Sequence, residues 1–273
     1  MRKDVDFIVQ KIKSLNKVDV FFKRHAIRLA PAISVLLHAI EQSQEFPKSL
    51  KIANLVLLEK RTIFYLDFLA KIVEAVTDNS LDYMLPVESE GQFAYQKGRS
   101  TDLCVAIGLH RVECCPEKCL NCDFDCKKAF DSTYWKTVIQ TMEKKCGCGK
   151  LFLNYLSDRT YIFDINRYSD TKYRGFYKGF TDVVMGRGTP PGTILGPRLF
   201  SEFQETDISM NLSNPTWLWP GKFSDDKSPI AKWSSVLDGS VQMALDGTWA
   251  WREENHIDYH LTGPKRPFYY RLR

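Results

Sequence analysis

The stretch "KFSDDKSP" occupies residues 222–229 and contains two adjacent carboxylates, Asp225 and Asp226. Adjacent acids repel each other, so the pair either holds a cation or lies in a solvated turn. Two aspartates beside Ser, Lys and Pro are ordinary turn chemistry. These eight residues alone therefore favour a turn, and a cation site needs support from the rest of the chain.

The composition is that of an ordinary globular protein. The chain has 273 residues, of which 44% are hydrophobic and 26% are charged. This length is sufficient for a buried core, and the composition excludes a disordered tail protein. The formal net charge of +5 suits a polyanionic partner without requiring one.

The chain shows no signal for secretion or membrane insertion. Its first 14 residues, "MRKDVDFIVQKIKS", are charged and lack an apolar signal core. The most apolar stretch, residues 29–40, is too short to span a bilayer and contains a proline. We therefore expect an intracellular protein, nuclear or cytoplasmic, without a membrane partner.

The pattern of apolar residues predicts an α+β protein. Helical spacing occurs in residues 5–42, 68–85, 100–113, 134–147 and 236–256, and again after Pro197. Strand character occurs in residues 50–58, 159–166 and 179–188, and residues 121–131 resemble a strand that runs into a turn. No internal repeat is present, and this order of elements suits helices combined with antiparallel strands.

A third carboxylate is placed to join the pair. Asp125 lies one hundred positions before Asp225, at the end of a predicted strand. A carboxylate on a strand and a pair on a hairpin turn can converge on divalent cations. In-line phosphoryl transfer with two Mg²⁺ ions, roughly 3.5–4 Å apart, uses such an arrangement.

Six blocks of sequence, in order, resemble the reverse transcriptase domain of non-LTR retrotransposons. They are "FPKSLKIANLVLLEK" (46–60), "GQFAYQKGRSTD" (91–102), "DFDCKKAFD" (123–131), "LNYLSDRT" (153–160), "GRGTPPGTILGPRLF" (186–200) and "FSDD" (223–226). The resemblance implies the fingers and palm of a right-hand polymerase, with an antiparallel palm sheet, helices on one face and no thumb. It implies a single domain over roughly residues 30–265, with residues 1–115 mainly fingers and 116–273 mainly palm.

The resemblance also assigns roles at the acidic residues. Asp125 matches the first metal-binding aspartate, whose strand also offers the Phe124 carbonyl. Asp225 and Asp226 match the acidic pair of the polymerase hairpin. Phe130 matches the aromatic residue that packs under the incoming sugar and excludes a 2′-hydroxyl, although a core phenylalanine would also explain it.

Further roles follow by resemblance, each beside a simpler explanation. Gly188, Thr189, Pro190, Gly192 and Thr193 match a Gly-rich loop along template and nucleotide, or else form a turn before a helix. Lys60 and Arg61 match the residues that hold the triphosphate, or are two solvated charges. Arg99, Ser100 and Thr101 match a template-binding block, or begin a helix. Lys265 matches the lysine that protonates pyrophosphate, although its spacing differs.

Several positions depart from the family pattern. Lys60 is joined directly to Arg61, which shortens the fingertip hairpin. Pro191 replaces a usual glutamine and so lacks an amide side chain and a backbone donor. Lys227 stands where threonine is usual, and only "RPFYYRLR" follows Lys265. Without a thumb, we expect a weak grip on primer and template.

The cysteines offer an alternative metal site. Cys115, Cys119 and Cys122 have roughly finger-like spacing, with Cys126 nearby. No pair of CxxC motifs exists, and Cys126 adjoins Asp125. Reduced, partly buried thiols are the favoured interpretation, and zinc is not expected.

The resulting hypothesis is RNA-templated DNA synthesis by a fragment derived from a retrotransposon. Its partners would be an RNA template, a DNA primer and deoxynucleoside triphosphates, and its cofactor two Mg²⁺ ions, or Mn²⁺. The alternative is an inactive or co-opted remnant that binds nucleic acid or protein. An RNA-templated RNA polymerase is a third option, against which Phe130 argues.

Overall fold

The computed structural model describes residues 5–14, 20–58, 61–85, 91–126, 128–163, 186–190, 192–211, 213–257, 259–260 and 269–272. The chain forms two compact units, each made of two stretches of sequence. The first comprises Met1–Pro86 and Ile139–Arg198, and the second comprises Val87–Val138 and Leu199–Arg273. The boundaries of these units differ from the predicted ranges 1–115 and 116–273, and the assignment of fingers and palm stays a prediction. The mixed content of helices and strands agrees with the sequence prediction.

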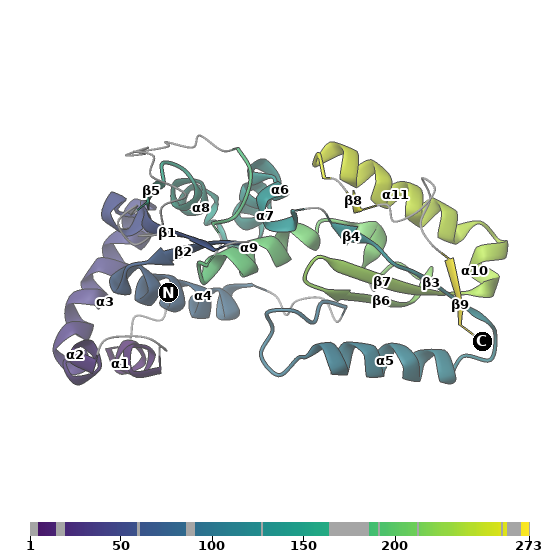
Figure 1. Cartoon of the computed structure of the whole chain (residues 1–273), viewed down its shortest axis with the longest axis horizontal. Helices are drawn as coiled ribbons and strands as arrows, with labels where there is room; N and C mark the ends of the chain where they lie inside the picture. The colour runs from purple at the N-terminus through teal and green to yellow at the C-terminus, as the bar shows by residue number, and fades with distance from the viewer. Residues whose placement is uncertain are drawn as a thin grey trace. The chain divides into compact units, whose positions relative to one another are not determined.

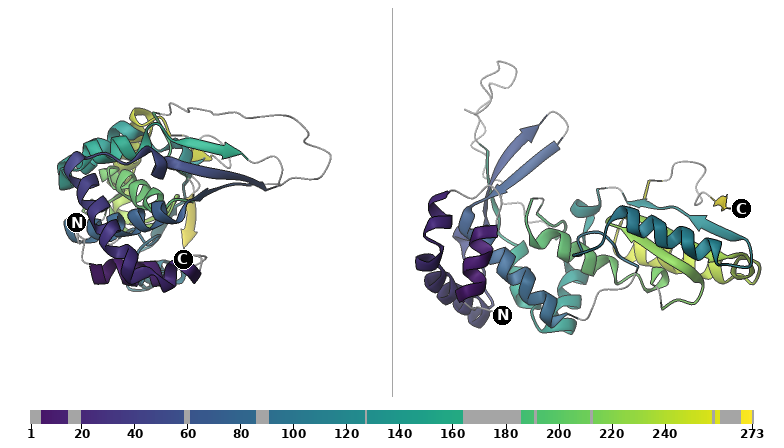
Figure 2. Two further views of the ribbon diagram at one scale, coloured as in Figure 1. Left: turned by 90° about the vertical axis from the view of Figure 1, so that its left-hand side faces the viewer. Right: turned by 90° about the horizontal axis from the view of Figure 1, so that it is seen from below.

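The first unit combines helices with a small sheet (Figure 1). Its elements are α1 (Val5–Ser14), α2 (Val20–Arg24), α3 (Ala26–Ser43), η1 (Lys48–Lys51), β1 (Ile52–Leu58), β2 (Arg61–Leu66), α4 (Phe68–Met84), α8 (Gly149–Leu156) and β5 (Thr160–Phe163). Strand β1 lies in the middle of the sheet, antiparallel to β2 and parallel to β5. Figure 2 shows the β1–β2 hairpin extending away from the helices of this unit.

The first unit's core lies between its helices. Helix α1 packs against α3 and α4. Ile8 and Ile12 of α1 and Leu37 of α3 are fully buried, as one apolar stripe per helix requires. Helix α4 begins at an N-cap, where the Asp67 carboxylate accepts a hydrogen bond from the Phe68 amide at 2.7 Å. The helices predicted in residues 5–42 and 68–85 are thus confirmed.

The second unit is built around a four-stranded sheet. Its elements are α5 (Thr101–Glu113), β3 (Cys119–Cys122), β4 (Asp125–Cys126), α6 (Ala129–Ser132), η3 (Ile208–Met210), β6 (Trp217–Phe223), β7 (Asp226–Lys232), α10 (Trp233–Leu237), α11 (Ser240–Glu254), β8 (Tyr259–His260) and β9 (Tyr269–Leu272). Helices α7 (Trp135–Cys146) and α9 (Leu195–Gln204) have residues in both units. The strand order is β6-β7-β3-β9, and every neighbouring pair is antiparallel.

Helices cover both faces of this sheet, which corrects the prediction of helices on one face. On one face, α5 packs on a core that includes Phe93, Trp219 and Ile230. Gly108 permits this close approach, because a Cβ atom there would lie 3.2 Å from the Trp219 ring. On the other face, the Lys227 side chain lies over Trp251 of α11, and Figures 1 and 2 show α5 and α11 on opposite sides of the strands. Trp219 and Ile230 are buried on the first face and Lys227 is buried on the second, so both faces of the sheet need cover.

Glycines lie at the ends of two helices, and the sequence predicted one of these ends. Gly147 follows α7 with a φ of +64°, as predicted for a C-cap. The helix predicted over residues 236–256 is instead divided into α10 and α11 at Gly239, whose φ is +84°. In the described part of the chain, no helix has both the length and the apolar character that crossing a bilayer requires.

Candidate functional site

The acidic pair lies at the tip of a β-hairpin. Strands β6 and β7 pair as far as Phe223 and Asp226, so Ser224 and Asp225 form a two-residue turn. Ser224 has a φ of +60°, and Asp225 is not among the residues with positive φ, which is the pattern of a type II′ hairpin turn. The turn and the cation site are therefore compatible: Asp225 occupies the turn and Asp226 begins the strand.

A second strand brings Asp125 to this hairpin. The Phe124 amide donates to the Lys227 carbonyl at 2.8 Å, and the Lys227 amide donates to the Phe124 carbonyl at 3.0 Å. In this antiparallel pair, the next residues outward are Asp125 and Asp226, so the register places them opposite each other. Acids one hundred positions apart in sequence thus become neighbours.

The acids repel one another. The pKa of Asp226 is raised above its ordinary value of 3.8, first by partial burial and then by the charges of Asp225, Asp125 and Asp123. Asp123 was not among the predicted site residues, although it stands two positions before Asp125, a spacing that puts both on the same side of an extended chain. Four carboxylates therefore contribute negative charge at one place.

The chemistry of this donor set fits Mg²⁺ or Mn²⁺, which prefer oxygen ligands such as carboxylates and backbone carbonyls. Asp125, Asp225 and Asp226 supply such oxygens from two strands and one turn. In the part of the chain that the structure describes, no group of three or more His, Cys, Asp or Glu side chains is already arranged to hold a metal ion. A cation would draw these carboxylates together by relieving their repulsion.

We expect Asp226→Asn to stabilise the metal-free protein at neutral pH. The raised pKa means that the folded protein binds more protons than the unfolded chain between 3.8 and the raised value, so stability falls as pH rises through that window. Above this window, removing one charge from the facing pair of Asp125 and Asp226 should raise the free energy of unfolding by roughly 0.2–1 kcal/mol, the scale of a cross-strand interaction. Chemical unfolding in EDTA at pH 7 and pH 4 measures this. An equal gain at both pH values would contradict the repulsion.

Residues 91–95 hold the turn from the outside of β6. The Gln92 side-chain oxygen accepts hydrogen bonds from the amides of Phe93, Ala94 and Ser224 at 3.0, 3.1 and 3.3 Å. The Tyr95 hydroxyl is 2.8 Å from the Ser224 hydroxyl. Gln92 is fully buried. The positive-φ residue of the acidic turn is therefore fixed by a segment more than 120 positions away, which the sequence analysis did not identify.

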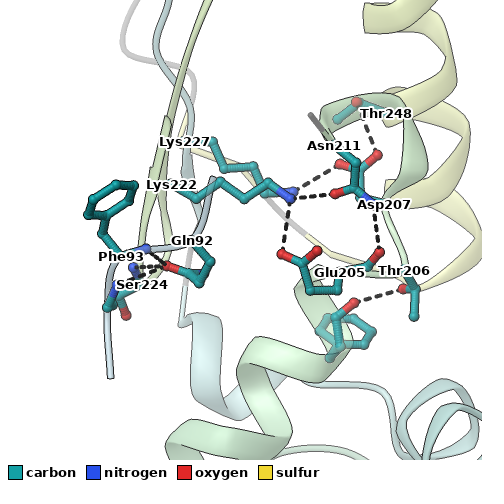
Figure 3. A network of polar contacts seen from close by, with 12 residues as sticks. Gln92, Phe93, Glu205, Thr206, Asp207, Asn211, Lys222, Ser224, Lys227 and Thr248 are labelled. Carbon is teal, nitrogen blue, oxygen red and sulfur yellow. Dashed lines mark hydrogen bonds and ion pairs between the residues drawn. The ribbon is translucent and has the colours of Figure 1, made fainter. Parts of the chain in front are cut away.

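Two lysines flank the turn, and their side chains extend to the face of the sheet opposite α5 (Figure 3). Lys222 and Lys227 are a cross-strand pair of β6 and β7, and each is 1% exposed. The Lys227 ammonium is 2.9 Å from Asp207, and the Lys222 ammonium is 2.8 Å from Asn211 and 3.4 Å from Glu205. These residues form a buried polar network directly behind the acidic turn.

Other predicted residues of the second unit have clear structural surroundings. Phe130 is half-buried, with ring centroids 6.0 Å from Tyr95 and 4.8 Å from Phe200. Arg99 donates to the Gln92 carbonyl and lies over the Phe93 ring. Ser100 is the N-cap of α5 and accepts from the Leu103 amide at 3.1 Å, and Thr101 begins that helix. The helix-start interpretation of Ser100 is confirmed, and template binding stays a prediction.

The Gly-rich loop belongs to the first unit. Gly188 and Gly192 have φ values of +86° and +80°, which residues other than glycine rarely adopt. The Thr193 hydroxyl donates to the Pro190 carbonyl at 2.7 Å and accepts from the Gly196 amide at 3.0 Å. The loop therefore turns tightly into α9, which begins at Leu195 rather than after Pro197. Thr189 is buried here, and Pro191 lies outside the described residues.

A buried carboxylate anchors this loop to α4. Glu74 accepts hydrogen bonds from the Tyr155 hydroxyl at 2.8 Å and from the Ile194 amide at 2.7 Å. Burial raises the pKa of Glu74, whereas Arg159 and these two hydrogen bonds act to lower it. Glu74 was not predicted as a site residue, because in the sequence it is one acid within an amphipathic helix.

Of the residues predicted to bind phosphate groups, Arg61 lies in the described part of the chain. Arg61 begins β2 and pairs with Leu58 of β1. Lys60 and Lys265 lie outside the described residues. Their assignments to the triphosphate and to pyrophosphate stay predictions.

All eight cysteines are free thiols. Cys119, Cys122 and Cys126 are buried, and burial raises the pKa of Cys122 to about 12 and that of Cys126 to about 11. These thiols stay protonated at neutral pH, so they pack as small apolar side chains.

The chain is similar to part of a transposon protein. No family model matches the chain. The chain is 26% identical over 228 residues to a protein of Drosophila melanogaster named "Probable RNA-directed DNA polymerase from transposon BS". The match covers 73% of this chain and 24% of that protein, so the chain spans about a quarter of the relative's length. The similarity indicates a reverse-transcriptase-like relationship.

Proposed function

We propose that this chain is the catalytic part of an RNA-directed DNA polymerase from a non-LTR retrotransposon. The observation that carries the proposal is the meeting of Asp125 with the acidic hairpin, through the backbone pair of Phe124 and Lys227. The similarity to a transposon polymerase supports the same activity. The fingers would lie in the first unit and the palm in the second.

In this proposal, the acids of the second unit form the catalytic centre. Asp125, Asp225 and Asp226, with the Phe124 carbonyl, would hold two Mg²⁺ ions, which Mn²⁺ can replace. When bound, the ions lower the pKa of the attacking hydroxyl and neutralise the leaving oxygens. The primer 3′-oxygen forms a bond to the α-phosphorus of the incoming nucleotide, and the bond to pyrophosphate breaks.

The remaining predicted residues would bind and select the substrates. Phe130, held between the rings of Tyr95 and Phe200, would lie under the sugar and exclude a 2′-hydroxyl. Its neighbours restrict its movement, as a steric filter requires. Substrate contacts are assigned to further residues: Lys60, Arg61, Gly188, Pro190, Gly192 and Lys265 for the nucleotide, and Arg99, Ser100 and Thr101 for the template.

Primer extension tests the proposal. The chain is incubated with a DNA primer annealed to an RNA template, Mg²⁺ or Mn²⁺, and either deoxynucleotides or ribonucleotides. We expect extension with deoxynucleotides and little with ribonucleotides. Preference for ribonucleotides would instead indicate an RNA polymerase. Binding of primer and template without extension, under conditions in which a longer form of the protein is active, would support the non-catalytic remnant.

A further inference from the structure

The acidic turn is flanked by two lysines that the proposed chemistry does not use. Lys222 and Lys227 occupy facing positions of β6 and β7, with only Phe223, Ser224, Asp225 and Asp226 between them. Each side chain is almost wholly buried. Burying an ammonium group is costly unless it is paired and hydrogen-bonded. Two such groups beside one turn therefore need compensation nearby.

The compensation comes from the segment between α9 and β6. Asp207, which is fully buried, accepts from Lys227 at 2.9 Å and from the Thr248 hydroxyl at 3.3 Å. Glu205 and the Asn211 side-chain oxygen accept from Lys222 (Figure 3). The two ammonium groups thus meet two carboxylates, and the buried network is balanced in charge.

Contacts of the Trp251 side chain tie this network to α11. The Lys227 ammonium lies 4.6 Å from the centre of the Trp251 ring, a cation–π distance. The Trp251 indole in turn donates to the Thr206 hydroxyl at 2.8 Å. The segment carrying Glu205 and Asp207 is therefore held against α11, so it offers the lysines a fixed docking point.

A buried ion network of this kind contributes little net stability. Replacing a buried ion pair by apolar residues of similar volume is often neutral or stabilising. What the network supplies is directional constraint. Phe223, adjacent to Lys222, packs on the apolar α5 face. A slip of one residue in the hairpin would exchange the two faces and place an ammonium group in that apolar core.

Lys227 also connects both acid-bearing strands. Its backbone makes the two hydrogen bonds to Phe124, the residue before Asp125, and its own chain neighbour is Asp226. The side chain of this one residue docks on Asp207 while its backbone aligns the two strands. A displacement of Lys227 would therefore move Asp226 relative to Asp125.

We propose that the network of Lys222, Lys227, Glu205 and Asp207 positions the acidic turn, fixing the register in which Asp225 and Asp226 face Asp125. Lys222 and Lys227 are positioning residues: they would act by holding Asp225 and Asp226 in place. The inference rests on the proposed function, which explains why the acids need to be aligned. The alignment itself can be measured without polymerase activity.

A double-mutant cycle separates positioning from stability. The variants are Lys227→Met, Asp207→Leu and both together. Either single change leaves a buried charge unpaired and should lower the melting temperature. The double variant should recover most of that loss. Its Mn²⁺ affinity should nevertheless stay about 10- to 100-fold below wild type, the scale for groups that orient metal ligands. The amides of residues 124 and 227 should exchange about tenfold faster with solvent.

Two further variants complete the design. Thr248→Val removes only one hydrogen bond to Asp207 and preserves side-chain volume, so it should fold and weaken Mn²⁺ binding a few-fold. Arg198→Met removes ion pairs to Asp78 and Asp82 in the first unit. It should leave the Mn²⁺ affinity and the exchange of the two amides unchanged. A double variant with wild-type amide exchange and wild-type Mn²⁺ affinity would overturn the inference and leave the network a purely structural role.

The two proposals can fail separately. If the wild-type protein binds Mn²⁺ but extends no primer, the proposed function fails, and the cycle still decides the positioning role. If the wild-type protein binds no Mn²⁺, the exchange rates of the amides of residues 124 and 227 decide the positioning role. Unchanged rates in the double variant would then reject positioning.

Discussion

Asparagine in place of Asp225 is expected to lower the rate of primer extension by about a thousandfold, with Asp125→Asn giving a similar loss. The substitution keeps the size of the side chain but removes the charge that would hold a divalent cation. Losing metal-based charge stabilisation costs several kcal/mol of transition-state energy, and about 4 kcal/mol corresponds to a thousandfold. Single-nucleotide extension under saturating primer and template measures the rate.

A matched control is available in the same unit. Asp246 is an exposed aspartate of α11 that accepts from the Gln242 side chain at 2.8 Å. Asp246→Asn makes the same change of charge away from the acidic turn, and we expect less than a twofold effect. Activity that survives in Asp225→Asn and in Asp125→Asn would remove both residues from the catalytic centre.

The second large effect concerns the fold. Glu74→Leu should lower the free energy of unfolding by about 3–5 kcal/mol, the range for breaking a buried charge interaction. The change removes the acceptor for the Tyr155 hydroxyl and the Ile194 amide, and it deprives the buried Arg159 of a nearby anion. Urea unfolding followed by far-UV circular dichroism measures the loss, and exchange of the Ile194 amide locates it.

Ser80→Ala is the comparison for this variant. Ser80 is also buried on α4, and its hydroxyl donates to the Val76 carbonyl of the same helix at 2.8 Å. Its loss should cost about 1 kcal/mol. If Glu74→Leu costs no more than Ser80→Ala, Glu74 does not anchor the Gly-rich loop, and the rigidity of that loop must have another origin.

Local signals in the sequence predicted much of the fold. Ser100 precedes an apolar repeat and caps α5, and Gly147 follows one and ends α7. The division at Gly239 was not predicted because the apolar spacing continues across it. Strand β9, which pairs with β3, was not predicted either, since four residues of "FYYRLR" carry too little pattern to distinguish a strand from a tail.

The candidate site was predicted from resemblance more than from spacing. Nothing between Asp125 and Asp225 in sequence indicates that they are neighbours. Two backbone hydrogen bonds, Phe124 to Lys227 and back, produce that proximity. The burial of Lys222 and Lys227 was not predicted, because their partners Glu205 and Asp207 lie 17 and 20 positions away in sequence. The role of Gln92 could not be predicted either, because its hydrogen bond with the Ser224 amide joins segments that are far apart in sequence.

The central claim is that Asp125, Asp225 and Asp226 share divalent cations. Mn²⁺ binding, followed by electron paramagnetic resonance on the wild-type protein and on Asp125→Asn and Asp225→Asn, tests it most directly. We expect the wild-type protein to bind Mn²⁺ in competition with Mg²⁺, and each variant to bind it at least about tenfold more weakly. Equal Mn²⁺ affinity in all three proteins would contradict the claim.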